Sequence, residues 1–396
     1  MKNLQIMRNK NLSTMFVADF ISSFGSVFLG MCMMLKIYRE TSSLITASII
    51  PFVTLVGNVI CTPIISNRKV TRSFRTLFFM GEMLAAIFVL CFLFIENIYI
   101  LLAVFITFQI IFFALETFRA EYLRINANDT EILKWQSLSR VVNGWVPVIA
   151  NLSAGYAMLH LSYNILVMGT GIFYLLAGLI ILGIDRDQYP LNINDAVKVT
   201  FRDFFVNEGR KKNEIYLGTF LILFLGSAAS IITLSYIVNF LEANDSQYGF
   251  LMASISFGAV IGSSLLNVSF VQRNLEEFSK KGTLLMGLLL LTVLFEPGYF
   301  VLLGILFVSG VISSVIMTYY SIEIYKLYKP EEIRFQFAKF GVISNMAQGI
   351  SRPIGGYVDK VFGAVNGLAS AGAMFILLAI GFFYYDREDQ KKPMAG

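Results

Sequence analysis

Twelve apolar segments, arranged six and six around one polar stretch at residues 185–213, constrain the fold of this chain more than any other feature. A helix needs roughly 20 mostly apolar residues to cross the hydrocarbon layer of a membrane. Of the 396 residues, 56% are hydrophobic and 14% are charged, whereas soluble domains have about 25% charged residues. The sequence therefore predicts an all-α membrane protein with twelve transmembrane helices, near residues 12–36, 43–66, 74–95, 98–121, 136–158, 163–184, 214–241, 247–270, 282–296, 298–326, 335–358 and 363–385.

The positions of Lys and Arg indicate the orientation, because cytoplasmic loops retain positive charge. With the N-terminus inside, all but six of the 31 basic residues fall in cytoplasmic segments, the six being Lys36, Arg39, Lys360, Arg119, Arg140 and Arg352. Both termini are thus expected in the cytoplasm, and the net charge of +5 reflects topology rather than nucleic-acid binding. The first segment contains Asp19 and lacks a small-residue cleavage pattern, so we expect a retained helix rather than a signal peptide.

The polar stretch at 185–213 divides the chain into two halves of similar length. It mixes acidic and basic residues with Pro190 and has few large apolar clusters, which is typical of a linker. We predict an N-terminal six-helix bundle at residues 1–184, a cytoplasmic linker at 185–213 and a C-terminal six-helix bundle at 214–396. An even number of helices gives both bundles the same orientation in the membrane.

The two halves also match each other at a nearly constant offset. Glu116 to Arg119 near the end of the fourth segment recurs 207 positions later as Glu323 to Lys326. Val146 to Ile149 recurs 206 positions later as Arg352 to Gly355, and Arg68 finds Arg273 at an offset of 205. Agreement among three weak matches indicates an internal duplication, as in transporters built from two parallel six-helix repeats.

The fourth and fifth segments carry a set of spaced residues: Arg119, Asn126, Ala127, Ser137, Arg140, Pro147 and Gly155. The second half has a counterpart at Pro330 to Arg334 and Arg352 to Tyr357. These motifs resemble those of the major facilitator superfamily, in its branch of drug and siderophore exporters that includes macrolide-efflux and enterobactin-export proteins. The resemblance implies a secondary transporter that works by alternating access, with segments 1, 4, 7 and 10 lining a central cavity.

Two carboxylates lie well inside apolar segments, where a charged side chain costs about 2.5 to 3.5 kcal/mol on insertion scales. Asp19 lies near Ser22, Ser23 and Ser26 in the first segment. It is either a proton acceptor or cation contact, or the partner of a neighbouring Arg. Glu82 lies at a similar depth in the third segment, which the resemblance places at the periphery, so we favour interhelical packing over a role in transport.

Two acid–base pairs lie near the predicted cytoplasmic ends of the fourth and tenth segments. Glu116 with Arg119, and Glu323 with Lys326, are three residues apart and can meet on one helix face. We favour a cytoplasmic gate of ion pairs over direct contact with substrate or proton. By resemblance, basic residues such as Arg68 in the loop after the second segment belong to the same gating system.

Two further arginines lie within apolar segments. Arg140, nearer the cytoplasm, is expected to be a structural partner of Glu116 or Glu121. Arg352 lies in the outer half of its segment, where contact with lipid is costly, so it should face protein or water. It is expected either to hold an anionic group of the substrate or to pair with an acid such as Asp19.

Other classes of function lack their motifs. The sequence has no G-x-x-x-x-G-K-[ST] phosphate loop for ATP. Its single histidine, His160, has no second His or Cys nearby, which argues against a metal site and against a Ser-His-acid triad. We therefore expect no enzyme and no cofactor, but a monomer in the bacterial cell membrane whose partners are a small-molecule substrate, protons and lipid.

The favoured function is proton-coupled export of a hydrophobic or amphipathic compound. Two alternatives stay open. One is an importer of a small solute. The other is a non-transporting relative that acts as a sensor or immunity protein, which is favoured by Asn67 at the position where the superfamily usually has Asp.

Overall fold

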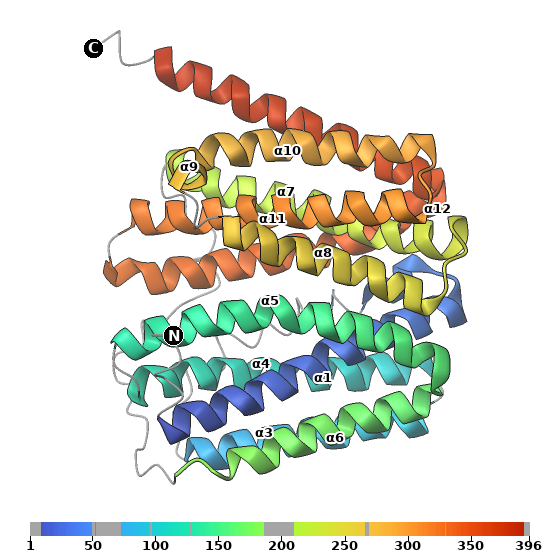
Figure 1. Ribbon diagram of the computed structural model, residues 1–396, viewed down its shortest axis with the longest axis vertical. Coiled ribbons are helices and arrows are strands. Elements are labelled where there is room, and N and C mark those ends of the chain that lie inside the picture. Colours follow the sequence, from blue (N-terminus) through green and yellow to red (C-terminus); the bar gives the residue numbers. More distant parts are fainter. Residues whose placement is uncertain are drawn as a thin grey trace. The chain divides into compact units, whose positions relative to one another are not determined.

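The computed structural model describes residues 9–49, 52, 73–95, 97–126, 129–185, 210–265, 269–328 and 330–391. Every element in this part of the chain is helical (Figure 1). By length and composition, eight of the described helices are able to cross a membrane. Most of the second predicted segment, most of the predicted linker and Arg68 lie outside the described residues.

The chain divides into two compact units. The first lies within Met1–Ser42 and Ile49–Val206, and the second comprises Ser43–Ser48 and Asn207–Gly396. Ser43–Ser48 thus pack with the second unit, although their sequence position is in the first half. Gly356 of the second unit allows this packing, because a Cβ there would lie only 3.0 Å from the amide nitrogen of Ile45.

The first unit contains the helices α1 (Lys10–Thr41), α3 (Phe74–Cys91) with the 3-10 turn η2 (Phe92–Phe94), α4 (Ile98–Asn126), α5 (Asp129–His160) and α6 (Tyr163–Ile181). Helix α1 packs against α5 and α6, and α3 packs against α4 and α6. In the core, Phe16 meets Trp135 edge to face, with ring centroids 5.3 Å apart. Large apolar side chains thus join helices that are far apart in the sequence.

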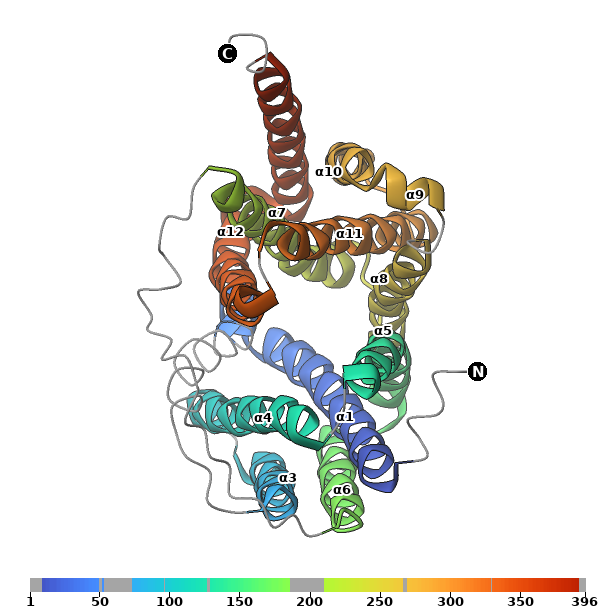
Figure 2. The ribbon, with the colours of Figure 1, turned by 90° about the vertical axis from the view of Figure 1, so that its left-hand side faces the viewer.

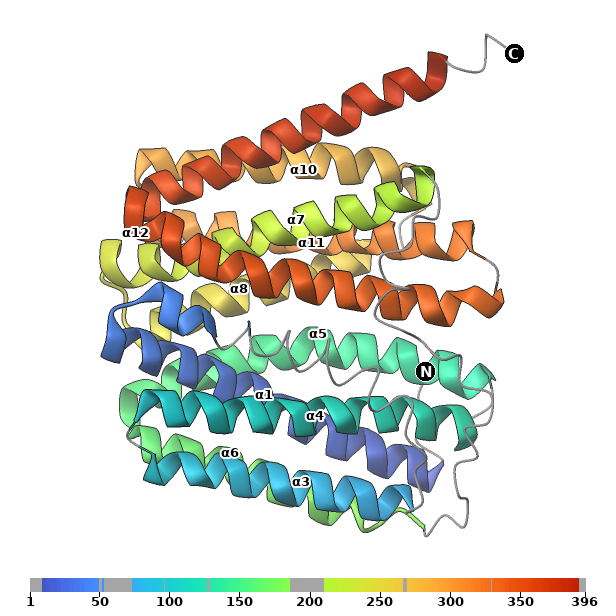
Figure 3. The same cartoon turned by 180° about the vertical axis from the view of Figure 1, so that it is seen from behind.

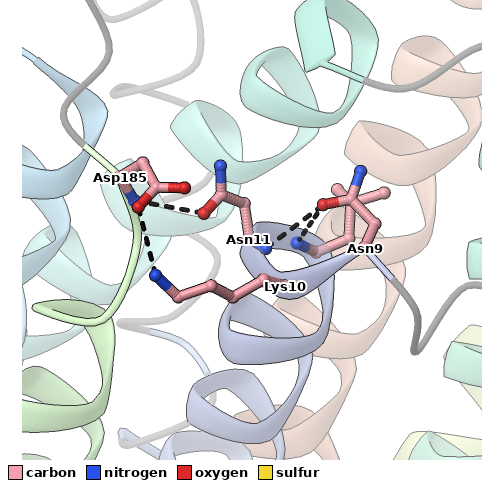
Figure 4. A network of polar contacts seen from close by, with 5 residues as sticks. Asn9, Lys10, Asn11 and Asp185 are labelled. Carbon is pink, nitrogen blue, oxygen red and sulfur yellow. Dashed lines mark hydrogen bonds and ion pairs between the residues drawn. The ribbon is translucent and has the colours of Figure 1, made fainter.

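Polar contacts at one end of this unit join α1 to the end of the α6 segment (Figure 4). Asn9 caps α1, because its side-chain oxygen accepts hydrogen bonds from the amides of Asn11 and Leu12. The amide of Asp185 donates a 3.1 Å hydrogen bond to Asn11, and Lys10 lies 3.1 Å from the Asp185 carboxylate. Both charged side chains are about two-thirds exposed, so this ion pair contributes little to stability.

The second unit contains α7 (Arg210–Ser235) with the π-helical turn η4 (Tyr236–Phe240), α8 (Asp245–Leu265), α9 (Ser269–Arg273), α10 (Leu275–Leu291) with the 3-10 turn η5 (Thr292–Phe295), α11 (Tyr299–Leu327) and α12 (Pro330–Lys391). Helix α7 packs against α12, and α8 packs against α11 (Figure 2). Helix α10 contacts both α11 and α12. This unit accounts for the predicted segments from residue 214 onward.

Some predicted boundaries are wrong by several residues, because polar flanking residues continue the helices. Helix α7 begins at Arg210, inside the predicted linker, and α10 begins at Leu275 rather than at residue 282. In the first turns of α10, Lys280 and Lys281 pair with Glu276 and Glu277 one turn earlier, at 2.7 Å and 2.5 Å. Such pairs support a helix where the sequence is no longer apolar.

Helix α12 includes the last two predicted segments, 335–358 and 363–385, in one bent element (Figure 3). The bend lies at Gly363, whose φ of 77° is in the left-handed region that favours glycine. The arm after the bend packs closely on α10, since a Cβ on Gly372 would lie 2.8 Å from the Gly287 carbonyl oxygen. Glycine thus turns the chain and also lets the returning arm approach its neighbour.

Glycines also bring the backbones of α8 and α11 together. A Cβ on Gly258 would overlap the carbonyl oxygen of Phe307, and one on Gly310 would overlap the carbonyl oxygen of Ile255. Gly258 and Gly262 form a small-x-x-x-small pattern, which is a common contact surface between membrane helices. The contact depends on backbone approach rather than on large side chains.

Candidate functional site

A buried ion pair joins α1 to α4 in the first unit. The carboxylate of Asp19 contacts the guanidinium of Arg119, and the two side chains are only 12% and 10% exposed. Asp19 lies roughly 13 Å along the helix axis from Lys10, at 1.5 Å per residue. The pair therefore lies within the apolar length of α1, where an isolated charge would be costly.

A second carboxylate, that of Glu82 on α3, lies close to this pair. Ser22 of α1 donates a 3.1 Å hydrogen bond to Glu82 Oε2, and Ser23 donates one of 3.3 Å to Asp19 Oδ1. Glu82 is 1% exposed, and both Arg119 and Asp19 are close enough to act on it electrostatically. Glu82 thus joins α3 to α1 through this hydrogen bond, and it also belongs to the cluster that contains Asp19.

We call Asp19, Ser22, Ser23, Glu82 and Arg119 the acid cluster. It has two carboxyl groups and one guanidinium, so it carries no net charge when one carboxyl group holds a proton. A neutral cluster is the less costly state in a medium of low polarity. A proton gained or lost by either carboxyl group would change the charge beside Arg119.

The other predicted ion pairs are described only in part. In α11, Lys326 Nζ lies 2.6 Å from Glu323 Oε1, and Glu323 is the more buried partner. The side chains of Glu116 and Arg140, and all of Arg68, lie outside the described residues. The predicted pairing of Arg119 with Glu116 therefore stays a prediction, whereas its contact with Asp19 is present.

Arg352 lies in the first arm of α12 in the second unit. Its Nε is buried without a hydrogen bond, and Tyr248 of α8 is close enough to act on it electrostatically. Next to it, Gly355 allows close packing on α7, since a Cβ there would lie 2.6 Å from the carbonyl oxygen of Ala228. The structure thus places Arg352 inside this unit, with its Nε buried and Tyr248 of α8 nearby.

Some polar contacts of the second unit are not foreseen in the sequence analysis. Tyr248 lies 104 positions before Arg352, and nothing in the sequence pattern links the two. Tyr216 of α7 donates a 2.5 Å hydrogen bond to Gln336 of α12, and Lys339 Nζ lies 4.8 Å from the centroid of the Tyr216 ring. Lys339 is visible in the sequence as a charge near the cytoplasmic start of the predicted segment 335–358, but its partner, 123 positions earlier, is not predictable from the sequence pattern.

Comparison with known proteins supports the fold. Residues 215–395 match the sequence profile of the Major Facilitator Superfamily. No curated protein matches the sequence. The profile covers the second half of the chain, so the fold of the first half rests on the comparison of structures.

Solved transporter structures resemble the whole chain. A bacterial homologue of the iron transporter ferroportin in its inward-facing state has a TM-score of 0.70 at 12% identity, and the match covers 95% of this chain and 99% of that one. The nucleoside transporter NupG has a TM-score of 0.69 at 14% identity, covering 95% and 98%. A bacterial homologue of the lysosomal transporter Spinster has a TM-score of 0.73 at 11% identity, covering 94% and 96%. The chain therefore has the major facilitator fold, as predicted.

Proposed function

We propose that this chain, which has the major facilitator fold, is a secondary transporter that exports a hydrophobic or amphipathic small molecule in exchange for protons. The similar structures include transporters of iron and of nucleosides, so the fold supports transport but does not define the solute. The observation that carries the proposal is the acid cluster, in which two buried carboxyl groups share one arginine.

Proton coupling follows from the charge of the acid cluster. When Asp19 is ionised, it holds Arg119 and ties α1 to α4. When Asp19 takes up a proton, the charge attraction to Arg119 is lost, and the contact between the two helices weakens. Because Glu82 lies beside the same guanidinium, it is able to take over part of this interaction. Protonation thereby alters helix contacts in the half of the protein that must move during alternating access.

The direction and the class of solute rest on the resemblance to exporters and on the apolar composition. The chain has 37 Phe and 16 Met residues, which suit an adaptable apolar surface for varied compounds. We propose that a set of charged residues gates the cytoplasmic side. They are Glu323 with Lys326, and the predicted Glu116, Arg119, Arg140 and Arg68. Arg352 is proposed to contact the solute.

The test uses purified protein in proteoliposomes, with Hoechst 33342 and ethidium as first amphipathic probes. An imposed pH gradient should drive uphill movement of a probe in wild type. Asp19→Asn should abolish uphill movement but retain downhill counterflow, because the amide preserves shape and cannot carry the proton. Asp185→Asn is the matched control, since it removes a carboxylate from an exposed ion pair.

Each outcome separates the alternatives. Uphill transport that is unchanged in Asp19→Asn would remove Asp19 from coupling. Greater accumulation of a probe in energised cells that contain the protein, relative to cells without it, would identify an importer. Absence of counterflow for every probe, together with specific binding to a protein partner, would support the non-transporting alternative.

A further inference from the structure

Arg352 is a charged residue of the second unit whose buried Nε has no hydrogen bond. Its guanidinium makes no hydrogen bond or ion pair with any residue that the structure describes, and Nε is buried. Arg352 as a residue is only partly buried, but a charged Nε–H that is buried without a hydrogen bond is unfavourable. The position therefore needs a negative charge that the described contacts do not supply.

The groups around Arg352 suit a bound anion. Tyr248 of α8 is close enough to act on the guanidinium electrostatically and is itself 1% exposed, so its hydroxyl is a second polar group nearby. Gly355 and Gly356, one turn further along α12, have no side chains and let α7 and Ser43–Ser48 approach the same helix face. The polar groups of Arg352 and Tyr248 thus lie near a part of α12 that packs closely against α7 and Ser43–Ser48.

Nearby acids do not neutralise Arg352 directly. Asp359 lies on the same face of α12 but two turns away, about 10 Å along the helix axis. Its carboxyl group lies near Ser235 of α7, and its Oδ1 is buried without a hydrogen bond. Asp245 opens α8 one turn before Tyr248, and it already has an interaction of its own.

We infer that Arg352, with Tyr248, binds the anionic group of an amphipathic solute, a carboxylate or phosphate carried on an apolar body. The inference rests on the proposed transport function and defines its substrate class. A guanidinium presents several N–H donors in a planar fork, which matches the two oxygens of a carboxylate or phosphate. The hydroxyl of Tyr248 supplies a further donor from another helix.

Binding is tested with a matched pair of fluorescent probes, 1-pyrenebutyrate and 1-pyrenebutanol, which differ in charge but share the apolar body. Wild-type protein in detergent should bind the acid more tightly than the alcohol. Arg352→Gln should weaken binding of the acid by about tenfold or more, the range of a charge-assisted hydrogen bond. Binding of the alcohol should change by less than about twofold.

Further variants separate the charge of Arg352 from its shape. Arg352→Lys should retain part of the preference for the acid, because the charge remains but the fork is lost. Tyr248→Phe should weaken binding of the acid by only a few fold. Lys360→Gln removes an exposed positive charge from the same arm of α12 and should change neither affinity.

Several results would overturn the inference. One is a folded wild-type protein that binds the acid no more tightly than the alcohol. A folded wild-type protein that binds neither probe would count as the same result. Another is an Arg352→Gln variant that loses both probes equally, which would indicate a packing role. A lipid headgroup offers the same anion chemistry, so native mass spectrometry with phosphatidylglycerol is the third arm. Arg352-dependent lipid retention would assign the site to lipid rather than to a solute.

The binding assay is independent of the transport assay. If the acid binds through Arg352 but no probe moves in proteoliposomes, the inference stands and the transport proposal fails. If the alcohol is transported but the acid neither binds selectively nor is transported, the proposed transport function stands and the proposed anion site is rejected.

Discussion

Arg119 contacts Asp19 where both side chains are almost fully removed from solvent. Removing one partner of a buried ion pair leaves an uncompensated charge, which typically costs about 3 to 5 kcal/mol. Arg119→Gln should therefore lower the thermal unfolding temperature of purified protein in detergent more than any single change in the exposed pair Lys10–Asp185, which should cost less than about 1 kcal/mol. In the double variant with Asp19→Asn, part of the stability should return. A double variant no more stable than Arg119→Gln alone would mean that the pair is not the source of the effect.

Glu82 tests whether a buried carboxyl group acts in packing or in coupling. In Glu82→Gln the amide oxygen is still able to accept the hydrogen bond from Ser22, so the unfolding temperature should change little. If Glu82 shares the transported proton with Asp19, however, uphill transport driven by a pH gradient should fall by about tenfold or more, as when a positioned proton carrier is lost. Ser22→Ala removes the hydrogen bond but keeps the carboxyl group. It should therefore lower the unfolding temperature and leave uphill transport largely unchanged. Full activity in Glu82→Gln would restrict this residue to interhelical packing.

At the scale of helices, close backbone contact between α8 and α11 gives a prediction with a control on the same helix. A Cβ added at Gly310 would overlap the carbonyl oxygen of Ile255, whereas at Gly304 it would meet nothing within 4 Å. Gly310→Ala should therefore destabilise the second unit by about 1 to 3 kcal/mol, the usual cost of overpacking. Gly304→Ala should be neutral or slightly stabilising, because Ala favours the helix. Equal unfolding temperatures for the two variants would show that the helices separate at little cost.

The helices were largely predictable from the sequence, and their partners were not. Runs of about 20 apolar residues define transmembrane helices because the backbone must satisfy its own hydrogen bonds in hydrocarbon. That rule predicted α3, α6 and α11 to within a few residues. It did not predict that Asp19 contacts Arg119, 100 positions away, because long-range pairing depends on how helices pack. The Tyr248 and Arg352 pair was missed for the same reason, although each side chain was visible as a polar group in an apolar segment.

At the scale of the whole chain, the sequence predicts that the two halves are repeats of each other. The offset between them places Arg352 opposite Val146, and helix α7 has no acidic residue at the position of Asp19. The proposed proton site and the proposed anion site thus lie in different units. Such a division suits alternating access, because each unit is able to respond to a different ligand while both belong to one transport cycle.

The orientation of the chain gives a prediction that involves no substrate. Retention of Lys and Arg in the cytoplasm predicts that both termini, and Asp185 shortly after α6, lie on the inner side. The turn at Glu296, where Tyr236 donates a 3.0 Å hydrogen bond to the Pro297 carbonyl, should lie outside. Alkaline phosphatase fused after Glu296 should therefore be active in a bacterial host, and the same enzyme fused after Asp185 should be inactive. A green fluorescent protein fused after Gly396 should fluoresce. The reverse pattern would invert the topology and place the predicted gating charges, Glu323 and Lys326 among them, on the outer side.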